Sequence, residues 1–391
     1  GSTILKDGQI FTLDDKEEEL GDNSRACVSY HELADALKVG HVILIDDGKV
    51  ALKVQKIEEH QIICKVTHGG KISNHKSLNV PNVSIPMTYL SEVDKSDLLF
   101  GISQGVEFVA ASFVRNKQDM IDIRSFLDEN GGKGIEIIAK IENTEGVRNF
   151  EDILDIADGI MVARGDLGVE IPFKDIPSLQ KQIIEVCNKQ GKISVVATQM
   201  LESMTNSPRP TRAEVSDVAN AVFDGTNAIM LSGESANGLY PFDAVKTMSS
   251  IAESAERSLY HRKVNEPNVK KDVTQAVCKA GYEAAEYLNA KCIVVCSTSG
   301  HTAKIISKYH PSVPVIALVA EEHGCRQCSL YYDLYPIKVE KKQSPQEVTE
   351  LGKQKASELK LTKKGDVVVL LAGTNFSYGH MDSILVYEVE E

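Results

Sequence analysis

Three charged residues close two neighbouring apolar stretches of the chain. Lys140 and Glu142 end the stretch IEIIAKIE, and Asp166 follows the next one, GIMVARGD. Side chains alternate along a strand, so Lys140 and Glu142 share a face. Two carboxylates from adjacent strands are suitable oxygen ligands for Mg²⁺ or Mn²⁺, and a lysine beside them would hold an anionic oxygen. This combination suits phosphoryl transfer or enolate chemistry; the alternative is a buried ion pair that only offsets its own desolvation.

Two further residues belong to the same predicted rim. The segment ARGDLGVEIP is expected to form a glycine-framed turn, in which Gly165 allows the backbone to approach a ligand closely. The amides that follow could bind a carboxylate, although a plain turn after a strand explains the segment equally. Thr198 ends the next apolar stretch with a hydroxyl at the same rim, where threonines are common.

The positions of these residues follow from a repeated pattern of apolar strands and amphipathic helices. Five apolar segments recur between residues 86 and 262, namely EFVAASF, IEIIAKIE, GIMVARGD, ISVVATQM and NAIMLSGES. Helical patterns fill the gaps, such as PSLQKQIIEVCNKQG, which ends at a glycine. The pattern predicts an α/β fold with a parallel sheet. In a (β/α)₈ TIM-type barrel the carboxyl ends of the strands form the active-site face, but five units do not close eight strands.

Segments with two other sequence patterns flank residues 86–262. Residues 1–85 are β-rich, with a hairpin turn predicted at Asp46-Asp47-Gly48, and indicate a small all-β domain. Residues 263–391 show a second alternation of helices and strands, which predicts a doubly wound α/β domain.

A loop in the last domain has the residues of a phosphate site. STSGHT stands between a predicted strand and a helix, where hydroxyls and amides favour phosphate. The candidates are Ser297, Thr298, Ser299, Gly300, His301 and Thr302. The alternative is a helix cap formed by Ser299 or Thr302. No Walker motif or dinucleotide fingerprint occurs at a strand–helix junction.

Composition narrows the class of partners. The 391 residues carry a net charge of −13, which argues against a general nucleic-acid binder. No apolar run reaches the ~18 residues of a membrane helix. The eight cysteines lie mostly in apolar stretches, as expected of buried thiols in a reducing compartment. Cys325 and Cys328 form a lone C-x-x-C without a second ligand pair, so structural zinc is not favoured.

From about residue 40 to the C-terminus the chain resembles the pyruvate kinase family. The matching blocks are IIAKIENTEGV, DGIMVARGDLGVEIP, ATQMLESM, PRPTRAEVSDVANAVFDGTNAIMLSGESANGLYP and GDVVVLLAG. The resemblance implies a cytoplasmic glycolytic enzyme that transfers the phosphoryl group of phosphoenolpyruvate to ADP, giving pyruvate and ATP. It also implies Mg²⁺ or Mn²⁺, often K⁺, and a homotetramer.

The resemblance also implies residue roles. Lys140 would stabilise the phosphoryl group in transit, and Glu142 and Asp166 would hold the divalent ion. The backbone at Gly165 and Asp166, with Thr198, would bind the substrate carboxylate, and Thr198 would lie near the site of enolate protonation. The first domain is similar to the family's mobile lid, and the last to its regulatory domain, in which residues 297–302 match the effector phosphate loop.

The chain departs from the family pattern in three places. The family has three barrel βα units before the lid, which carry the K⁺ ligands and an arginine for phosphoryl transfer, and this chain starts at the lid. We therefore expect the chain to be incompetent alone. The lid stretch SNHKSLNVPN lacks the family's usual glycines, which weakens Asp46 and Lys76 as nucleotide contacts. The loop with Asn375 and Asp382 differs from members activated by fructose 1,6-bisphosphate, and argues against that activation.

Two other functions remain open. A barrel lyase or aldolase that acts on pyruvate enolates also uses Mg²⁺ with Glu and Asp. A truncated, non-catalytic fragment that binds partners or effectors would also fit the missing start of the barrel.

Overall fold

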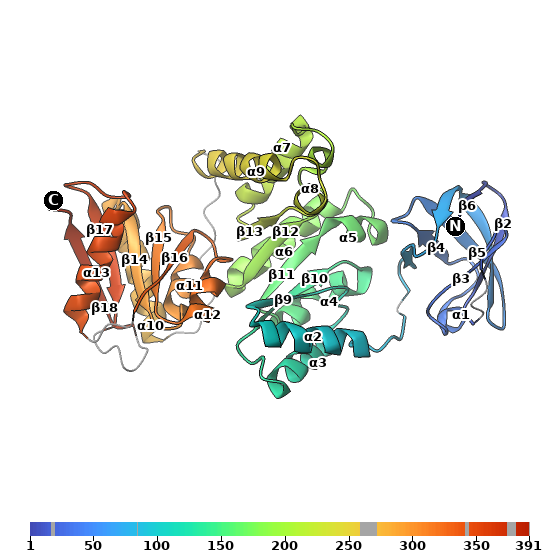
Figure 1. The fold of residues 1–391 in the computed structure, drawn as a ribbon, viewed down its shortest axis with the longest axis horizontal. Coiled ribbons are helices and arrows are strands. Elements are labelled where there is room, and N and C mark those ends of the chain that lie inside the picture. Colours follow the sequence, from blue (N-terminus) through green and yellow to red (C-terminus); the bar gives the residue numbers. More distant parts are fainter. Residues whose placement is uncertain (17–19, 84, 259–271, 341–343, 374–380, 391) are drawn as a thin grey trace.

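The computed structural model describes residues 1–390 except 17–19, 84, 259–271, 341–343 and 374–380. Three bodies follow one another along the long axis of the molecule (Figure 1). The expected domain boundary at 262/263 and the departure at Asn375 lie outside the described residues. The boundary at 85/86 falls between β8 (Leu78–Asn79) and α2 (Glu92–Gln104).

The first body is built of antiparallel strands, apart from the parallel pair β2–β3. A six-stranded sheet has the order β3-β2-β6-β5-β4-β8, and a separate pair joins β1 to β7. Asp46 and Asp47 have φ of 53° and 57° and form the predicted hairpin turn between β4 and β5. The side chains of Phe11, Leu52 and Ile62 are fully buried in its core. The remaining elements are β1 (Ser2–Leu5), β2 (Ile10–Asp14), β3 (Arg25–Cys27), α1 (Leu33–Ala36), β4 (Val42–Ile45), β5 (Val50–Glu58), β6 (Gln61–His68) and β7 (Gly70–Ser73).

The central body holds the five predicted strands in one parallel sheet. Its order is β13-β12-β11-β10-β9. The strands are β9 (Phe108–Ala111), β10 (Glu136–Ile141), β11 (Gly159–Ala163), β12 (Ile193–Ala197) and β13 (Ala228–Met230). The helices are α2, α3 (Lys117–Glu129), α4 (Thr144–Ile156), α5 (Arg164–Glu170), α6 (Ile176–Gln190), α7 (Arg212–Phe223), α8 (Gly233–Ala236) and α9 (Pro241–Glu256), with the 3₁₀ turn η1 (Glu202–Thr205). Within the described part of the chain, no strand pairs with the outer edge of β9 or β13.

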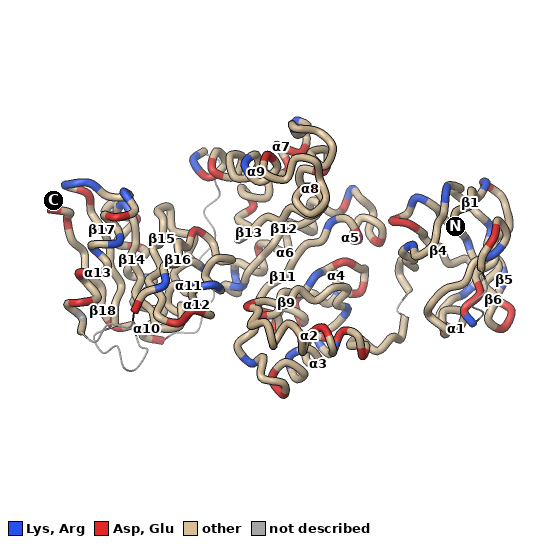
Figure 2. Tube along the Cα trace, in the orientation of Figure 1, with Lys and Arg blue, Asp and Glu red and all other residues tan. Residues whose placement is uncertain are grey.

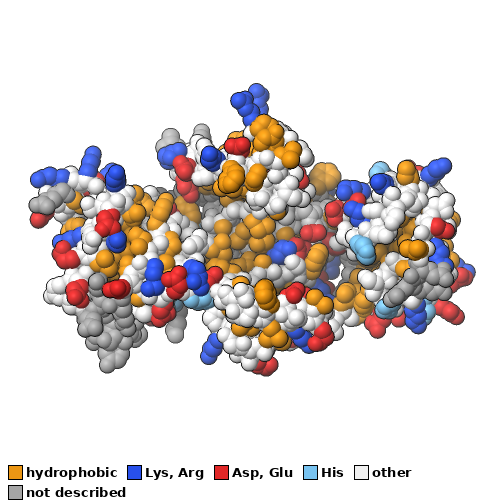
Figure 3. Space-filling model, viewed as in Figure 1, with side chains coloured by type: hydrophobic (Ala, Val, Ile, Leu, Met, Phe, Trp, Pro, Cys, Tyr) orange, Lys and Arg blue, Asp and Glu red, His pale blue; other side chains and the backbone are white. Residues whose placement is uncertain are grey.

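The strand sequence explains how this sheet is oriented. Ile137, Ala139 and Ile141 of β10 pack into the core cluster formed with α3, α4 and α6. Ile138 points to the opposite face and packs with Met161 and Val195. Figure 3 shows hydrophobic side chains gathered in the middle of the molecule, over this sheet. Lys140 lies on the same face as Ile138, because the two residues are separated by one alternation of the strand.

The C-terminal body is the predicted doubly wound sheet with one difference. Its order is β16-β15-β14-β17-β18, in which β18 is antiparallel to β17. One core cluster lies under α10 and α11, and another lies on the opposite face with α13. The elements are α10 (Val273–Leu288), β14 (Cys292–Ser297), α11 (His301–Ser307), β15 (Val315–Val319), α12 (Glu322–Cys328), β16 (Leu334–Lys338), α13 (Pro345–Glu358), β17 (Val367–Ala372) and β18 (Ser383–Glu388).

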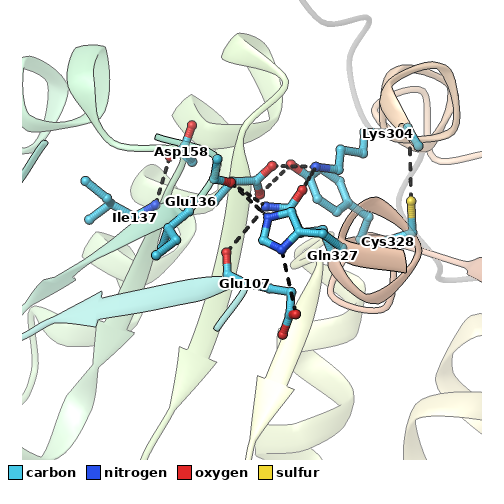
Figure 4. A network of polar contacts seen from close by, with 12 residues as sticks. Glu107, Glu136, Ile137, Asp158, Lys304, Gln327 and Cys328 are labelled. Carbon is cyan, nitrogen blue, oxygen red and sulfur yellow. Dashed lines mark hydrogen bonds and ion pairs between the residues drawn. The ribbon is translucent and has the colours of Figure 1, made fainter. Parts of the chain in front are cut away.

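A polar network joins the C-terminal body to the start of β10 (Figure 4). Lys304 Nζ lies 2.6 Å from Glu136 Oε1 and 2.7 Å from Gln327 Oε1. The Tyr331 hydroxyl donates to the other Glu136 oxygen at 2.9 Å. The side chains of Lys304 and Glu136 are only 13% and 16% exposed, so the pair is largely withdrawn from water.

Charges and thiols are distributed as expected for a folded multidomain chain. Figure 2 shows acidic and basic residues intermixed over all three bodies, with the parallel sheets mostly free of them. Seven of the eight cysteines are buried free thiols, and Cys27 is half-buried. Burial raises the pKa of Cys64, Cys187 and Cys292 to about 12. Among the described residues, no helix combines the length and apolar character needed to cross a bilayer.

Candidate functional site

The end of β10 carries a buried ion pair. Lys140 Nζ lies 2.8 Å from Glu142 Oε1, and the Glu142 side chain is 1% exposed. The backbone amide of Phe113 donates to Glu142 Oε2 at 2.7 Å, and Lys140 Nζ donates to Ser112 Oγ at 2.8 Å. Both oxygens of Glu142 therefore have partners, and Lys140 is oriented by groups from two adjacent strands.

Asp166 lies after the next strand, but in a helix rather than in the predicted turn. α5 begins at Arg164 directly after β11, and Leu167 is fully buried. The turn prediction was wrong because Gly165 and Gly168 suggested a loop, whereas burial of Leu167 and Arg164 stabilises a helical conformation that the sequence pattern does not reveal. An acidic residue in the first turn of a helix is also favoured by the helix dipole. β10 and β11 are adjacent and parallel, with Ile141 level with Val162.

Thr198 begins a strained turn at the end of β12. Thr198 and Gln199 have φ of 66° and 52°, in the left-handed region that disfavours residues other than glycine. Each such residue costs about 1–2 kcal/mol. The backbone amide of Gly165 donates to Thr198 Oγ1 at 2.8 Å, and that hydroxyl donates to the Ala197 carbonyl at 2.6 Å. The structure thus brings Gly165 and Thr198 together.

Arg164 lies beneath this turn and was not among the predicted site residues. Its guanidinium donates to the Thr198 carbonyl at 2.7 Å and to Asp217 Oδ1 of α7 at 2.7 Å. The Arg164 residue is 8% exposed. The only sequence signal for it was its place at the end of an apolar strand; its contact with Asp217 joins residues far apart in the chain.

A cavity of about 570 Å³ opens between the lid and the central body. Asp166 and Gly165 line it together with Arg164, Gln199 and, from the lid, Asp47. Its apolar side includes Phe173, whose side chain is 85% exposed. The cavity makes α5 accessible from the space beside the lid.

The donor set at these strand ends fits a divalent cation of the Mg²⁺ type. Mg²⁺ is usually held by one or two carboxylates, with substrate oxygens and waters completing six positions. Glu142 follows β10, and Asp166 lies in the first turn of α5 after the adjacent strand β11. In the described ranges no group of three or more His, Cys, Asp or Glu side chains gathers to hold a metal. Glu142 would have to share an oxygen that now accepts from Lys140 or Phe113.

The proposed nucleotide contacts form an ion pair within the lid. Lys76 Nζ lies 2.8 Å from Asp46 Oδ1. This contact holds the pKa of Asp46 below its ordinary value, against a smaller effect of burial. The lid also contacts the central body, where Asn79 Nδ2 donates to Glu170 Oε1 at 3.3 Å. Burial raises the pKa of Glu170.

The loop 297–302 is tightly built. Ser297 Oγ accepts from the Gly300 amide at 3.1 Å, and Gly300 has φ of 82° as the residue before α11. No side chain caps this end of α11, so the alternative of a cap by Ser299 or Thr302 is wrong. A Cβ on Gly324 would lie 2.0 Å from the Ser299 carbonyl oxygen, so α12 packs directly against the loop. The backbone carbonyl of Thr298 accepts a hydrogen bond from the Glu321 amide. Thr302 is buried, whereas His301 is exposed.

The parallel βα sheet with a lysine and two carboxylates after its strands belongs to the α/β class of folds, in which the carboxyl ends of the strands carry the functional groups. Family models narrow this class: the pyruvate kinase barrel domain matches residues 2–245, and the pyruvate kinase alpha/beta domain matches residues 275–387. The chain therefore belongs to the pyruvate kinase family.

Relatives named pyruvate kinase agree with this assignment. The chain is similar to one from Clostridium perfringens, at 46% identity over 95% of this chain and 80% of the relative. One from Clostridium acetobutylicum is 45% identical over 99% of this chain and 82% of the relative. One from the yeast Debaryomyces hansenii is 41% identical over 97% and 77%. Pyruvate kinase function is supported, and neither the lyase nor the non-catalytic fragment is favoured.

Proposed function

We propose that the cluster at the ends of β10, β11 and β12 transfers the phosphoryl group of phosphoenolpyruvate to ADP. The observation that carries the proposal is the buried pair of Lys140 and Glu142, 2.8 Å apart, on the strand next to the one that leads to Asp166. A lysine ammonium at this place neutralises the charge of a phosphoryl group in transit. Ser112 keeps the ammonium directed along the face of the sheet.

The reaction divides into two steps with separate requirements. In the first, the bond between phosphorus and the enol oxygen breaks while a terminal ADP oxygen bonds to phosphorus, next to Lys140. In the second, the methylene carbon of the enolate takes a proton and pyruvate forms. Thr198, with the backbone at Gly165 and Asp166, binds the carboxylate end and lies near the carbon that is protonated. A divalent ion held by Glu142 and Asp166 would supply charge neutralisation at the phosphoryl and enolate oxygens.

The proposal extends to the rest of the molecule. Residues 1–85 act as the lid, 86–262 as the catalytic domain and 263–391 as the regulatory domain, with residues 297–302 binding an effector phosphate. Asp46 and Lys76 contact the nucleotide after their ion pair opens. The cofactors are Mg²⁺ or Mn²⁺, with K⁺ as a further ion of the family. The enzyme works as a cytoplasmic homotetramer, without nucleic acid or membrane partners.

Full turnover requires a closed barrel. Both edges of the five-stranded sheet are free of strand partners in the part of the chain that the structure describes. We therefore expect the described strand ends to bind substrate analogues more readily than they turn over phosphoenolpyruvate, because turnover needs the reacting atoms to be enclosed by further strands.

Binding of oxalate, an enolate mimic, with Mn²⁺ tests the site directly. Calorimetry on the purified chain should show oxalate binding that depends on the metal. Glu142→Gln and Asp166→Asn should each weaken Mn²⁺ binding at least tenfold, because each removes an anionic ligand. Lys140→Met should lower any phosphoenolpyruvate- and ADP-dependent formation of ATP by about 10²–10³-fold.

A surface lysine provides the matched control. Lys117 is 44% exposed and pairs with Asp155 on the surface, so Lys117→Met should leave binding and turnover unchanged. Oxalate binding that ignores Mn²⁺, or Lys140→Met turnover equal to that of the parent chain, would contradict the proposed site. Normal turnover by the parent chain would contradict only the requirement for a closed barrel.

A further inference from the structure

The buried guanidinium of Arg164 is not used by the proposed reaction. It reaches the turn at the end of β12 from the start of α5, with its two terminal nitrogens engaged. One donates to the Thr198 carbonyl, and the other lies 2.7 Å from both oxygens of Asp217. The Nε atom is buried without a hydrogen-bond partner. The terminal nitrogens therefore have hydrogen-bond acceptors on the turn and on α7, whereas Nε has none.

The turn that Arg164 contacts needs external support. Thr198 and Gln199 are consecutive non-glycine residues with positive φ, a conformation that relaxes unless surrounding contacts impose it. The far end of this turn is held from a different direction, since the Leu201 amide donates to Glu234 Oε1 at 3.0 Å, and Glu234 is fully buried. Arg164 holds the first residue of the turn and Glu234 holds the last.

The orientation of the Thr198 hydroxyl depends on this turn. With φ at 66°, Thr198 Oγ1 accepts from the Gly165 amide at 2.8 Å, and Gly165 lines the cavity beside Asp166. Relaxation of Thr198 to negative φ would rotate its Cβ away from α5. Arg164 and Gly165 are adjacent in sequence. The side chain of Arg164 supports the Thr198 turn, and the backbone amide of Gly165 donates to the Thr198 hydroxyl.

We propose that Arg164 is a positioning residue: held by Asp217, it fixes Thr198 in the left-handed conformation in which its hydroxyl accepts from the Gly165 amide, beside the backbone proposed to bind the substrate. The inference rests on the proposed role of Thr198 in substrate binding. Arg164 touches no reacting atom and acts through Thr198. A lysine could reach either Asp217 or the Thr198 carbonyl, but it lacks the planar fork that reaches both.

A double-mutant cycle on oxalate binding in the presence of Mg²⁺ tests the inference. Arg164→Met and Thr198→Ala should each raise the dissociation constant of oxalate at least tenfold. The dissociation constant of oxalate for the double variant should be within about twofold of that for Thr198→Ala. The effects of two residues that act through one contact on binding are not additive. Arg164→Lys should lie between the parent chain and Arg164→Met. Exchange of pyruvate methyl protons with D₂O should follow the same order.

The matched control is Arg257→Met, which removes an arginine that follows α9, is 72% exposed and pairs with Glu253. It should bind oxalate like the parent chain. If Arg164→Met does not fold, Asp217→Asn and Arg164→Lys carry the test, since both keep a polar group in the pocket. Each of these two variants should weaken oxalate binding less than Thr198→Ala does. Combining either of them with Thr198→Ala should not weaken oxalate binding further.

Hydrogen exchange of the Gly165 amide gives a readout independent of any ligand. Its exchange should be at least tenfold faster in Arg164→Met or Asp217→Asn, because the turn that supplies its acceptor relaxes. The inference would be overturned if both variants exchanged the Gly165 amide and bound oxalate like the parent chain. It would also be overturned if the losses of oxalate affinity in Arg164→Met and Thr198→Ala multiplied in the double variant. If the parent chain binds no oxalate, the proposed function fails, and the Gly165 exchange alone decides whether Arg164 fixes the turn.

Discussion

At the scale of single residues, Asp333 gives the molecule a pH dependence outside the proposed site. Burial, with a smaller contribution from the nearby Glu256 carboxylate, raises the pKa of Asp333 to about 7. In the unfolded chain the same carboxyl titrates at about 3.9. Between these values the folded state binds a proton that the unfolded state does not, so stability decreases as pH rises from about 4 to about 7 and then levels off.

Asp333→Asn should remove this pH dependence. Asparagine tolerates the positive φ of 49° at this position. We expect the variant to be more stable than the parent at pH 8, on the order of 1–3 kcal/mol, and to differ little at pH 4. Thermal unfolding of both chains from pH 4 to 8 measures the difference. Equal slopes of melting temperature against pH would show that Asp333 does not titrate in this range.

Residue-level predictability depended on whether contacts were local. Alternation along one strand was enough to place Lys140 and Glu142 on one face, and their 2.8 Å contact follows from that. The contact of Arg164 with Thr198 depends on a left-handed backbone and on Asp217 from α7, neither of which leaves a periodic signal. The roles of the predicted residues stay predictions until the variants are measured.

At the scale of elements, α7 is fixed by its N-cap residue, Thr211. Thr211 Oγ1 accepts from the Glu214 amide at 3.2 Å, and Glu214 Oε2 accepts from the Thr211 amide at 2.7 Å. The same carboxylate binds the Ser203 amide at 2.7 Å, which connects the helix to the segment after β12. This start matters for the site because α7 carries Asp217.

Thr211→Ala should destabilise the central body by about 1 kcal/mol, because it removes the N-cap acceptor. Thr211→Ser keeps a hydroxyl at the cap and should cost only a few tenths of that. Urea unfolding monitored by far-UV circular dichroism compares the two. A similar loss in both variants would show that the methyl group, and not the cap, stabilises α7.

Elements marked by an apolar run or a glycine stop were predictable, whereas α5 and the direction of β18 were not. The five parallel strands and α6, which ends at Gly191 with φ of 62°, follow from apolar runs and a glycine stop. α5 was missed because two glycines in seven residues weaken a helical pattern that tertiary burial restores. The antiparallel direction of β18 was also unpredictable, since strand direction at a sheet edge is decided by the path of the preceding loop.

At the scale of the whole molecule, the pair of Lys304 and Glu136 joins two bodies. Lys304→Met would leave Glu136 largely buried without its cation, which we expect to destabilise the contact by about 3 kcal/mol. Adding Glu136→Gln should recover much of this loss, because the remaining Tyr331 hydroxyl can donate to a neutral amide. Differential scanning calorimetry should show the central and C-terminal transitions separating in Lys304→Met.

The exposed pair of Lys279 and Glu283 supplies the control. Lys279 is 42% exposed, so Lys279→Met should change stability by less than about 0.5 kcal/mol. An equal effect of Lys279→Met and Lys304→Met would mean that the buried bridge contributes no more than a surface charge.

Each of the three bodies has a buried thiol that can report when its own core opens. Cys64 lies in the core of the lid, Cys187 in the central body and Cys292 in the C-terminal body, and the pKa of each is raised to about 12 by burial. At neutral pH almost none of these groups is a thiolate, so a thiol reagent reacts only after the surrounding core has opened. The order in which the three positions become modified is therefore a record of the order in which the three bodies come apart.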